Sequence, residues 1–119
     1  MSNITESLEA LVAIDGALTA ALVDSSNGML LGQAGAGLDL EVAAAGNTEV
    51  VRAKLRTVKS LGLSDSIEDI LITLTTQYHV IRPLSSMPEV FIYLVLDSKK
   101  SNLALARIKA KEIDGKLEL

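Results

Sequence analysis

The sequence of 119 residues contains no cysteine and no tryptophan, and phenylalanine occurs once, as Phe91. Without cysteine the chain can form neither a disulfide framework nor a thiolate zinc site, and it has no cysteine nucleophile. Aromatic residues make up only 3% of the chain, whereas hydrophobic residues together make up 49%. The core must therefore be packed by Leu, Ile, Val and Ala. The length suits a single domain, which we expect over residues 1–119.

Basic residues are too few and too scattered for a nucleic-acid surface. The chain has 11 Lys and Arg against 15 Asp and Glu, a net charge of −4, and its basic residues gather only at Lys99-Lys100 and in residues 107–111. Because duplex binding needs several phosphate contacts from one positive face, we expect no nucleic-acid partner. No segment approaches the roughly 20 apolar residues of a membrane span, and the N-terminus lacks a signal-peptide pattern. We therefore expect a cytoplasmic protein without membrane insertion.

The residues that usually carry catalysis are also missing. The single histidine, His79, lies in a predicted strand, where a lone His is more often a packing or hydrogen-bonding residue than a catalyst. Ser25-Ser26 lie in a predicted turn, and the chain has no Gly-x-Ser-x-Gly motif. The spacing of Gly32, Gly35 and Gly37 matches neither a dinucleotide nor a phosphate-binding loop, and the acidic residues lack calcium-loop spacing. We expect no catalytic residue, no cofactor and no metal site.

The first third of the chain predicts a helix and a hairpin. Asn3 and Glu6 have the spacing of a capping box, and Asp15-Gly16 should end the helix. Its apolar residues recur at helical spacing: Ile4, Leu8, Leu11 and Val12. Residues 17–23 are almost wholly apolar and precede Asn27-Gly28, a hairpin signal, and the short apolar run 29–31. Residues 32–37, rich in Gly and Ala, indicate a flexible connection.

Residues 38–61 predict a helix of roughly six turns that ends at Gly62. This helix has two apolar edges. The first consists of Ala43, Val50 and Leu61, and the second of Val51, Leu55 and Val58. A helix with more than one apolar edge usually contacts two partners.

The remaining chain predicts three strands and a helix. Residues 67–75 alternate, with Ile70, Ile72 and Leu74 on one face, as in a half-buried strand near a sheet edge. Residues 78–82 should be its hairpin partner, and residues 90–96 form a continuous apolar strand. Asp97 and Ser98 could cap a last helix, whose inner face we assign to Ala104, Leu105, Ile108 and the stem of Lys111.

These elements predict an α+β fold with the order helix, two strands, helix, three strands, helix. Residues 17–23 and 90–96 are the most uniformly apolar strands, so they should lie at the centre of a five-stranded antiparallel sheet. The hairpin 67–82 should run outward from that centre.

Three segments, in this order, resemble the roadblock/dynein light chain family over nearly the full length. They are residues 17–24 leading to Asn27-Gly28, residues 78–84, and Leu96-Asp97 followed by residues 102–107. The resemblance implies a roadblock fold with profilin-like layering. The absence of cysteine and the bare domain length favour a bacterial or archaeal, MglB-like member.

The resemblance also implies a homodimer. The long helix would pack antiparallel on its twin, and the strand at 67–75 would pair with its twin across the two-fold axis. Pairing would cover an unpaired strand edge, which is otherwise an aggregation hazard. The interface would comprise Val51, Leu55, Val58, Asp69, Leu71 and Thr73. Alternatively, both apolar edges of the helix could cover the chain's own sheet.

Similar proteins in bacteria and archaea are associated with Ras-like small GTPases, and the gliding-motility member is a GTPase-activating partner. The resemblance therefore implies a non-enzymatic module that binds and regulates a Ras-like small GTPase, as an activating partner or a scaffold. Arg52, Arg56 and Lys59 are candidate contacts because they project from the exposed side of the long helix. Alternative functions are a small-molecule sensing module and a purely structural scaffold.

Overall fold

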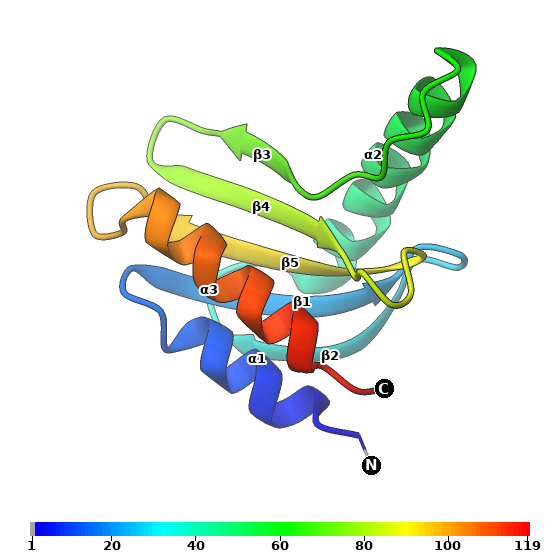
Figure 1. The fold of residues 1–119 in the computed structure, drawn as a ribbon. Helices are drawn as coiled ribbons and strands as arrows, with labels where there is room; N and C mark the ends of the chain where they lie inside the picture. The colour runs from blue at the N-terminus through cyan, green and yellow to red at the C-terminus, as the bar shows by residue number, and fades with distance from the viewer. Residues whose placement is uncertain (1) are drawn as a thin grey trace.

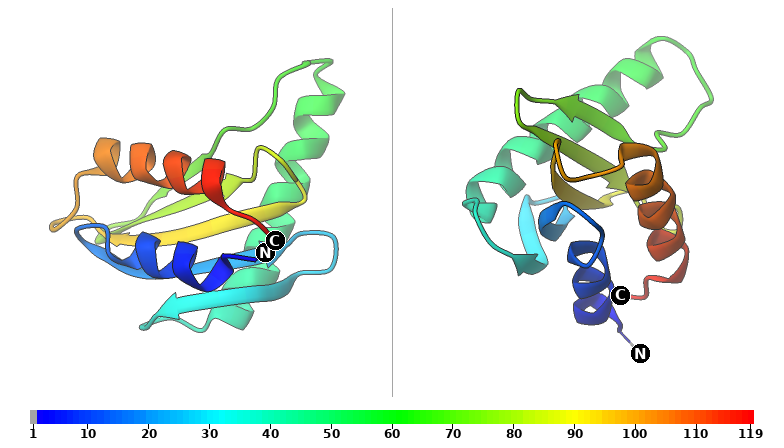
Figure 2. Two further views of the ribbon diagram at one scale, coloured as in Figure 1. Left: turned by 60° about the horizontal axis from the view of Figure 1, so that its bottom comes forward. Right: turned by 90° about the vertical axis from the view of Figure 1, so that its left-hand side faces the viewer.

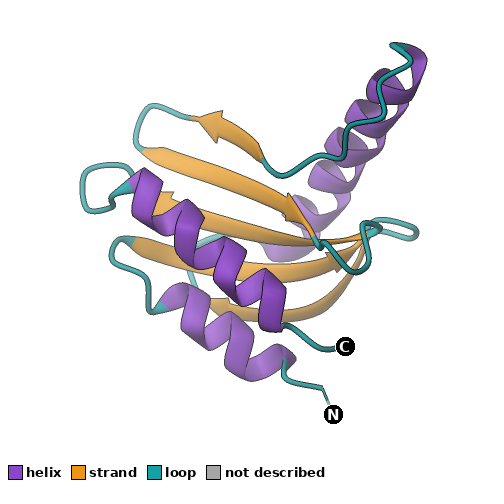
Figure 3. Ribbon diagram, viewed as in Figure 1, coloured by secondary structure: helices purple, strands orange, loops and turns teal. Residues whose placement is uncertain are grey.

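A computed structural model describes residues 2–119, which form three helices and a five-stranded antiparallel sheet. Figure 1 shows their arrangement, and Figure 3 separates helices from strands by colour. Their bounds are α1 Ile4–Val12, β1 Ala17–Asp24, β2 Met29–Gly35, α2 Leu40–Ser60, β3 Ile70–Thr73, β4 Gln77–Pro83, β5 Val90–Asp97 and α3 Leu103–Lys116. This order confirms the fold expected from the sequence.

The sheet has the strand order β2-β1-β5-β4-β3. The two most apolar strands, β1 and β5, are adjacent and central, and the β3–β4 hairpin runs outward, as predicted. Helices α1 and α3 lie on one face of the sheet and α2 lies on the other, as the two views of Figure 2 show. The strands therefore form the middle of three layers.

Two aliphatic clusters fill the spaces between the layers. One lies beneath α1 and α3 and includes Leu8, Leu22 and Leu94, all at most 1% exposed. The other lies beneath α2 and includes Val51 and Phe91, both fully buried. Successive side chains of a strand point to opposite faces, so β1 and β5 contribute to both clusters. Continuous apolar runs are what such doubly covered strands require.

Only the first half of α2 covers the sheet. The helix begins where the Asp39 carboxylate accepts a hydrogen bond from the Val42 amide. Its buried residues are Leu40, Ala44, Thr48 and Val51, and none lies beyond residue 51. The second half extends beyond the sheet, where Figure 1 shows it projecting past β3. It ends in a Schellman motif, in which the amides of Gly62 and Leu63 donate to the carbonyls of Lys59 and Val58.

The flexible connection predicted at residues 32–37 is wrong for its first part, because strand β2 continues to Gly35. Gly32 packs directly on α1: a Cβ there would lie 2.8 Å from side-chain atoms of Ile4 and Leu8. Gly35 has a φ of +80° and lies against the Leu18 carbonyl. These glycines are therefore explained by close approach and a left-handed backbone within paired structure, and not by flexibility.

The strand expected at residues 67–75 is shorter than predicted. Only Ile70–Thr73 pairs with β4, although the predicted faces are confirmed: Ile70 and Ile72 pack against the cluster beneath α2, and Leu71 lies on the opposite face. Residues 67–69 belong to no strand. Side-chain alternation alone could not show where pairing begins.

The capping and the inner face predicted for the last helix are wrong. Asn102 caps α3 by accepting from the Leu105 amide, whereas Asp97 accepts from the Lys99 amide in the preceding turn. The buried residues are Ala106, Ala110 and Asp114. Leu105 and Ile108 are 46% and 56% exposed, so two large apolar residues face outward while small ones let the helix lie close to the sheet.

The capping box predicted for α1 is also wrong. Asn3 lies at the N-cap, but its side chain makes no capping bond and Glu6 does not close a box onto it. Instead the Asn3 amide nitrogen donates to the Lys116 carbonyl, and its oxygen accepts from the Glu118 amide. Asn3 thus joins the start of α1 to the end of α3.

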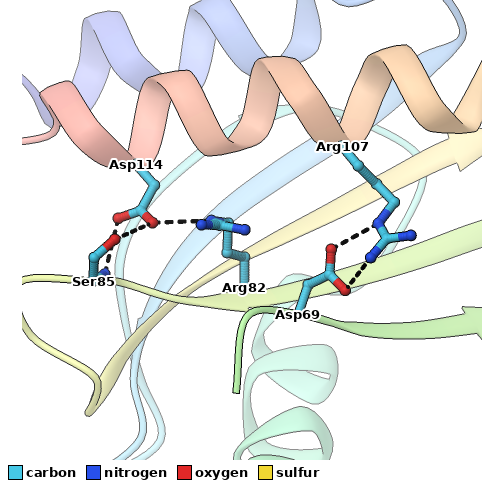
Figure 4. A network of polar contacts seen from close by, with 5 residues as sticks. All are labelled: Asp69, Arg82, Ser85, Arg107 and Asp114. Atoms are coloured by element: carbon cyan, nitrogen blue, oxygen red, sulfur yellow. Dashed lines mark hydrogen bonds and ion pairs between the residues drawn. The ribbon is translucent and has the colours of Figure 1, made fainter. Parts of the chain in front are cut away.

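A buried ion pair also joins α3 to strand β4 of the sheet. Arg82 of β4 donates to the Asp114 carboxylate over 2.9 Å, and the two side chains are 9% and 1% exposed. The Ser85 amide and hydroxyl also donate to this carboxylate, at 3.0 and 2.7 Å (Figure 4). Because the Arg82 side chain is itself buried, loss of the carboxylate would leave its guanidinium without a partner in the interior.

We therefore predict that Asp114→Ala lowers the free energy of unfolding by about 3–5 kcal/mol, the usual cost of leaving one member of a buried ion pair unpaired. Urea denaturation followed by circular dichroism measures this change. The matched control is Glu112→Ala on the exposed side of the same helix, which should shift stability by no more than about 0.5 kcal/mol. Equal effects of the two substitutions would contradict the assigned role of Asp114.

Candidate protein interface

The C-terminal half of α2 exposes apolar side chains that no other part of the described chain covers. Between residues 52 and 61 every position is exposed except Val58, which is half-buried. Leu55 is 38% exposed and Leu61 67% exposed. Leu63, just after the helix, is 49% exposed. An apolar surface gathered on a projecting helix is typical of a protein interaction site.

Strand β3 provides a free sheet edge close to this helix. Within residues 2–119 it pairs only with β4, so its outer backbone amides and carbonyls have no strand partner. Leu71 is 36% exposed, and Leu74, just beyond the strand, is 44% exposed. The edge carries no proline, and its four residues, Ile70–Thr73, carry no charge. Such an edge readily accepts another strand.

Two of the residues expected at a dimer interface have other roles in this structure. Val51 has no exposed surface and packs in the cluster beneath α2. It therefore covers the chain's own sheet, which was the alternative to a place in the dimer interface. Asp69 accepts two hydrogen bonds of 2.8 Å from Arg107 of α3, as Figure 4 shows. Its side chain is only 11% exposed. The other four, Leu55, Val58, Leu71 and Thr73, retain accessible surface.

The three candidate GTPase contacts also differ from one another. Arg52 donates to the Ser26 carbonyl over 2.9 Å and so joins α2 to the β1–β2 turn. Arg56 and Lys59 are exposed and form no ion pair or side-chain hydrogen bond within residues 2–119. Lys54 accompanies them on the same half of the helix. Cations near a helix C-terminus interact favourably with its dipole, so this end of α2 can hold a basic surface without cost to the helix.

A polar network that no sequence pattern locates lies on the α2 face, next to β3. His79, opposite Ile72 in the β3–β4 ladder, contacts Gln77 through Nε2 and the Tyr93 hydroxyl through Nδ1, both at 2.9 Å. A neutral imidazole with its proton on Nε2 satisfies both contacts, donating to the Gln77 oxygen and accepting from Tyr93. The two rings meet edge to face, with centroids 5.4 Å apart.

Burial lowers the pKa of His79 and raises that of Tyr93, where a hydrogen bond with Asn47 of α2 acts in the opposite direction. Both shifts favour the neutral forms that the network needs. The histidine therefore serves as a hydrogen-bonding residue between two strands, as its isolation in the sequence indicated.

The remaining described surface bears on the expectations for metal, membrane and small-molecule sites. Residues 2–119 contain no cluster of three or more His, Asp or Glu side chains able to hold a metal ion. None of the described helices is both long and apolar enough to cross a membrane. An open groove of about 550 Å³ between α1 and α3 includes Ile14, Leu105 and Lys109. Small-molecule sensing stays an alternative hypothesis, and this groove is the candidate binding site for it.

Comparison with known proteins gives no match to a family model or to a curated protein sequence. Solved structures do match. MglB of Myxococcus xanthus has a TM-score of 0.81 at 20% identity, over 96% of this chain and 93% of that one. A Roadblock/LC7 domain from Streptomyces avermitilis has a TM-score of 0.83 at 12% identity, over 97% and 94% of the two chains.

This chain has the roadblock/LC7 fold. The gliding protein MglB of Thermus thermophilus also shares it, with a TM-score of 0.72 at 18% identity, over 95% of this chain and 89% of that one. The agreement extends over nearly the whole length of both chains in each comparison.

The lowered pKa of His79 predicts a pH dependence of stability. The unfolded chain, with an ordinary histidine pKa of 6.5, binds the proton more readily than the folded chain. The stability contributed by neutral His79 is therefore complete above about pH 6.5 and is lost as pH falls through the folded-state pKa.

Chemical denaturation at several pH values between about 7.5 and 5 measures this contribution. Stability should fall less steeply with decreasing pH in His79→Gln than in the unchanged protein. Tyr93→Phe keeps the buried imidazole and should retain the steeper fall. An unchanged slope in His79→Gln would show that the histidine is not the responsible group.

Proposed function

We propose that this protein is a homodimeric, non-enzymatic interaction module that binds and regulates a Ras-like small GTPase. The main observation behind the proposal is that two neighbouring surfaces of one chain are uncovered. They are the apolar C-terminal half of α2 and the free edge of β3. They lie on adjacent parts of one roadblock fold, and neither is covered within the described chain. A second copy, related by a two-fold axis, would cover both.

The dimer would use Leu55, Val58, Leu71 and Thr73, the members of the expected interface that keep accessible surface. In it, the α2 helices pack antiparallel and the β3 strands pair, which joins the two sheets into one. Fully burying an exposed leucine is worth up to about 1.5–3 kcal/mol before ordering costs. Pairing of the β3 edges would also remove an aggregation-prone feature. Asp69 would lie at the margin, held by Arg107.

The GTPase would bind to the surface formed by the paired α2 helices. Arg56 and Lys59 are exposed on this surface and have no partner side chain within residues 2–119, so they are available as rim contacts. Arg52 is less suited because its guanidinium already donates to the Ser26 carbonyl. The fold supports this proposal through its likeness to MglB, and the sequence supports it through its resemblance to a family with GTPase partners.

Regulation would act through the GTPase's own catalytic residues. We expect any acceleration of hydrolysis to come from a rearrangement of the GTPase switch loops, and not from an arginine supplied by α2. If the partner binds without a change in hydrolysis rate, the module is a scaffold.

Binding of purified Ras-like GTPases from the same organism, loaded with GDP or with a non-hydrolysable GTP analogue, tests the proposal. We expect one nucleotide state to bind more tightly, and Arg56→Glu with Lys59→Glu to weaken that binding roughly tenfold, about 1.4 kcal/mol. The matched control is Lys111→Glu on α3, across the sheet, which should leave affinity unchanged. Failure of every such GTPase to bind in either state would refute the proposal.

A further inference from the structure

The edge of the sheet opposite β3 is formed by β2, and it too is unpaired. Within the described residues β2 pairs only with β1, and Figure 2 shows it as the outermost strand at its end of the sheet. Its seven residues contain no charge and no proline, two common protections of an exposed edge, although its register with β1 shifts at Leu31, as in a β-bulge. Met29 is 61% exposed and Leu31 41% exposed. This edge is therefore open to strand addition.

A hollow lies directly beside this edge. It measures about 350 Å³ and is lined by Gly28, Met29, Leu30, Glu41 and Ala44, where the start of β2 faces the N-terminal half of α2. Apolar atoms of Leu30 and Ala44 provide a place for one aliphatic side chain, while Glu41 supplies a carboxylate at the border. An edge strand with a neighbouring side-chain pocket is the arrangement that recognises extended peptides in β-augmentation.

Acidic and basic residues are unevenly distributed along the chain, and their distribution indicates the charge of the partner. The first 51 residues contain seven acidic side chains and neither Lys nor Arg, whereas all 11 basic residues follow from Arg52 onward. The acidic part folds into α1, β1, β2 and the first half of α2, so it lies at the β2 end of the sheet (Figure 1). Near the edge itself, Asp39 and Glu41 are exposed. Arg52, the first basic residue of the chain, already donates to the Ser26 carbonyl.

We propose that the free edge of β2 binds an extended segment of a partner protein that carries alternating apolar residues flanked by Lys or Arg. The segment adds as a sixth strand through backbone hydrogen bonds, inserts one aliphatic side chain into the hollow beside Met29 and Leu30, and pairs a cation with Glu41. A second copy of this chain fits the edge less well, because β2-to-β2 pairing would bring two acidic ends together. This site is separate from the α2 and β3 surface and does not depend on the proposed dimer.

The test uses a displayed library of random linear peptides of about ten residues, long enough to span the strand. Peptides selected on the unchanged protein are then synthesised. We expect alternating apolar residues with basic flanks, and binding that weakens as salt is raised. In hydrogen exchange, a bound peptide should slow the amides of residues 29–35 and leave those of residues 70–73 unchanged.

Three variants locate the site. Leu31→Lys places a charge on the edge, and Glu41→Lys reverses the charge at the hollow, so each should weaken peptide binding about tenfold. Leu105→Lys changes a leucine of similar exposure, 46%, on α3 and should have no effect. The proposal is overturned if no peptide is selected, if the selected peptides protect residues 70–73 instead, or if protection of residues 29–35 comes from self-association without peptide.

Discussion

The structure depends on one constraint: β1 and β5 are apolar on both faces, so helices must cover both sides of the sheet. Helices α1 and α3 complete one side, aided by small residues such as Ala106 and Ala110 that allow close approach. On the other side only the first half of α2 is used. The remaining half of the helix extends beyond the sheet and carries its apolar residues with it. The candidate interface is thus a consequence of how the core is closed.

The sheet's centre and order could be predicted because they follow from side-chain hydrophobicity alone. Residues 17–23 and 90–96 have no polar face, and that property places them between two helical layers. The end of β2 could not be predicted in the same way, because Gly32 and Gly35 have two possible explanations. Only the position of α1 and the Leu18 carbonyl shows that close packing, and not flexibility, requires them.

The candidate interface could be predicted only in part, because the sequence pattern does not show which residues the rest of the fold covers. Periodicity identifies the apolar edges of α2, but it does not show which turn lies over the sheet. It therefore places Val51 and Leu55 on one edge, although Val51 is buried and Leu55 is exposed. Long-range pairing is equally invisible in sequence. Asp69 and Arg107 are 38 residues apart, and Asn3 contacts residues more than 110 positions away. The Tyr93 partner of His79 likewise comes from a different strand.

The central claim is that the projecting half of α2 and the β3 edge together bind a second copy of the chain. Light scattering of the purified protein tests it most directly, because the chain has a mass of 12.6 kDa. The account predicts twice that mass for the unchanged protein and for Leu105→Glu, a control on the opposite face of the sheet. It predicts a folded single chain for Leu55→Glu, because a buried unpaired carboxylate should weaken association at least about a hundredfold. A monomeric unchanged protein, or a folded Leu55→Glu variant that keeps the doubled mass, would contradict the account.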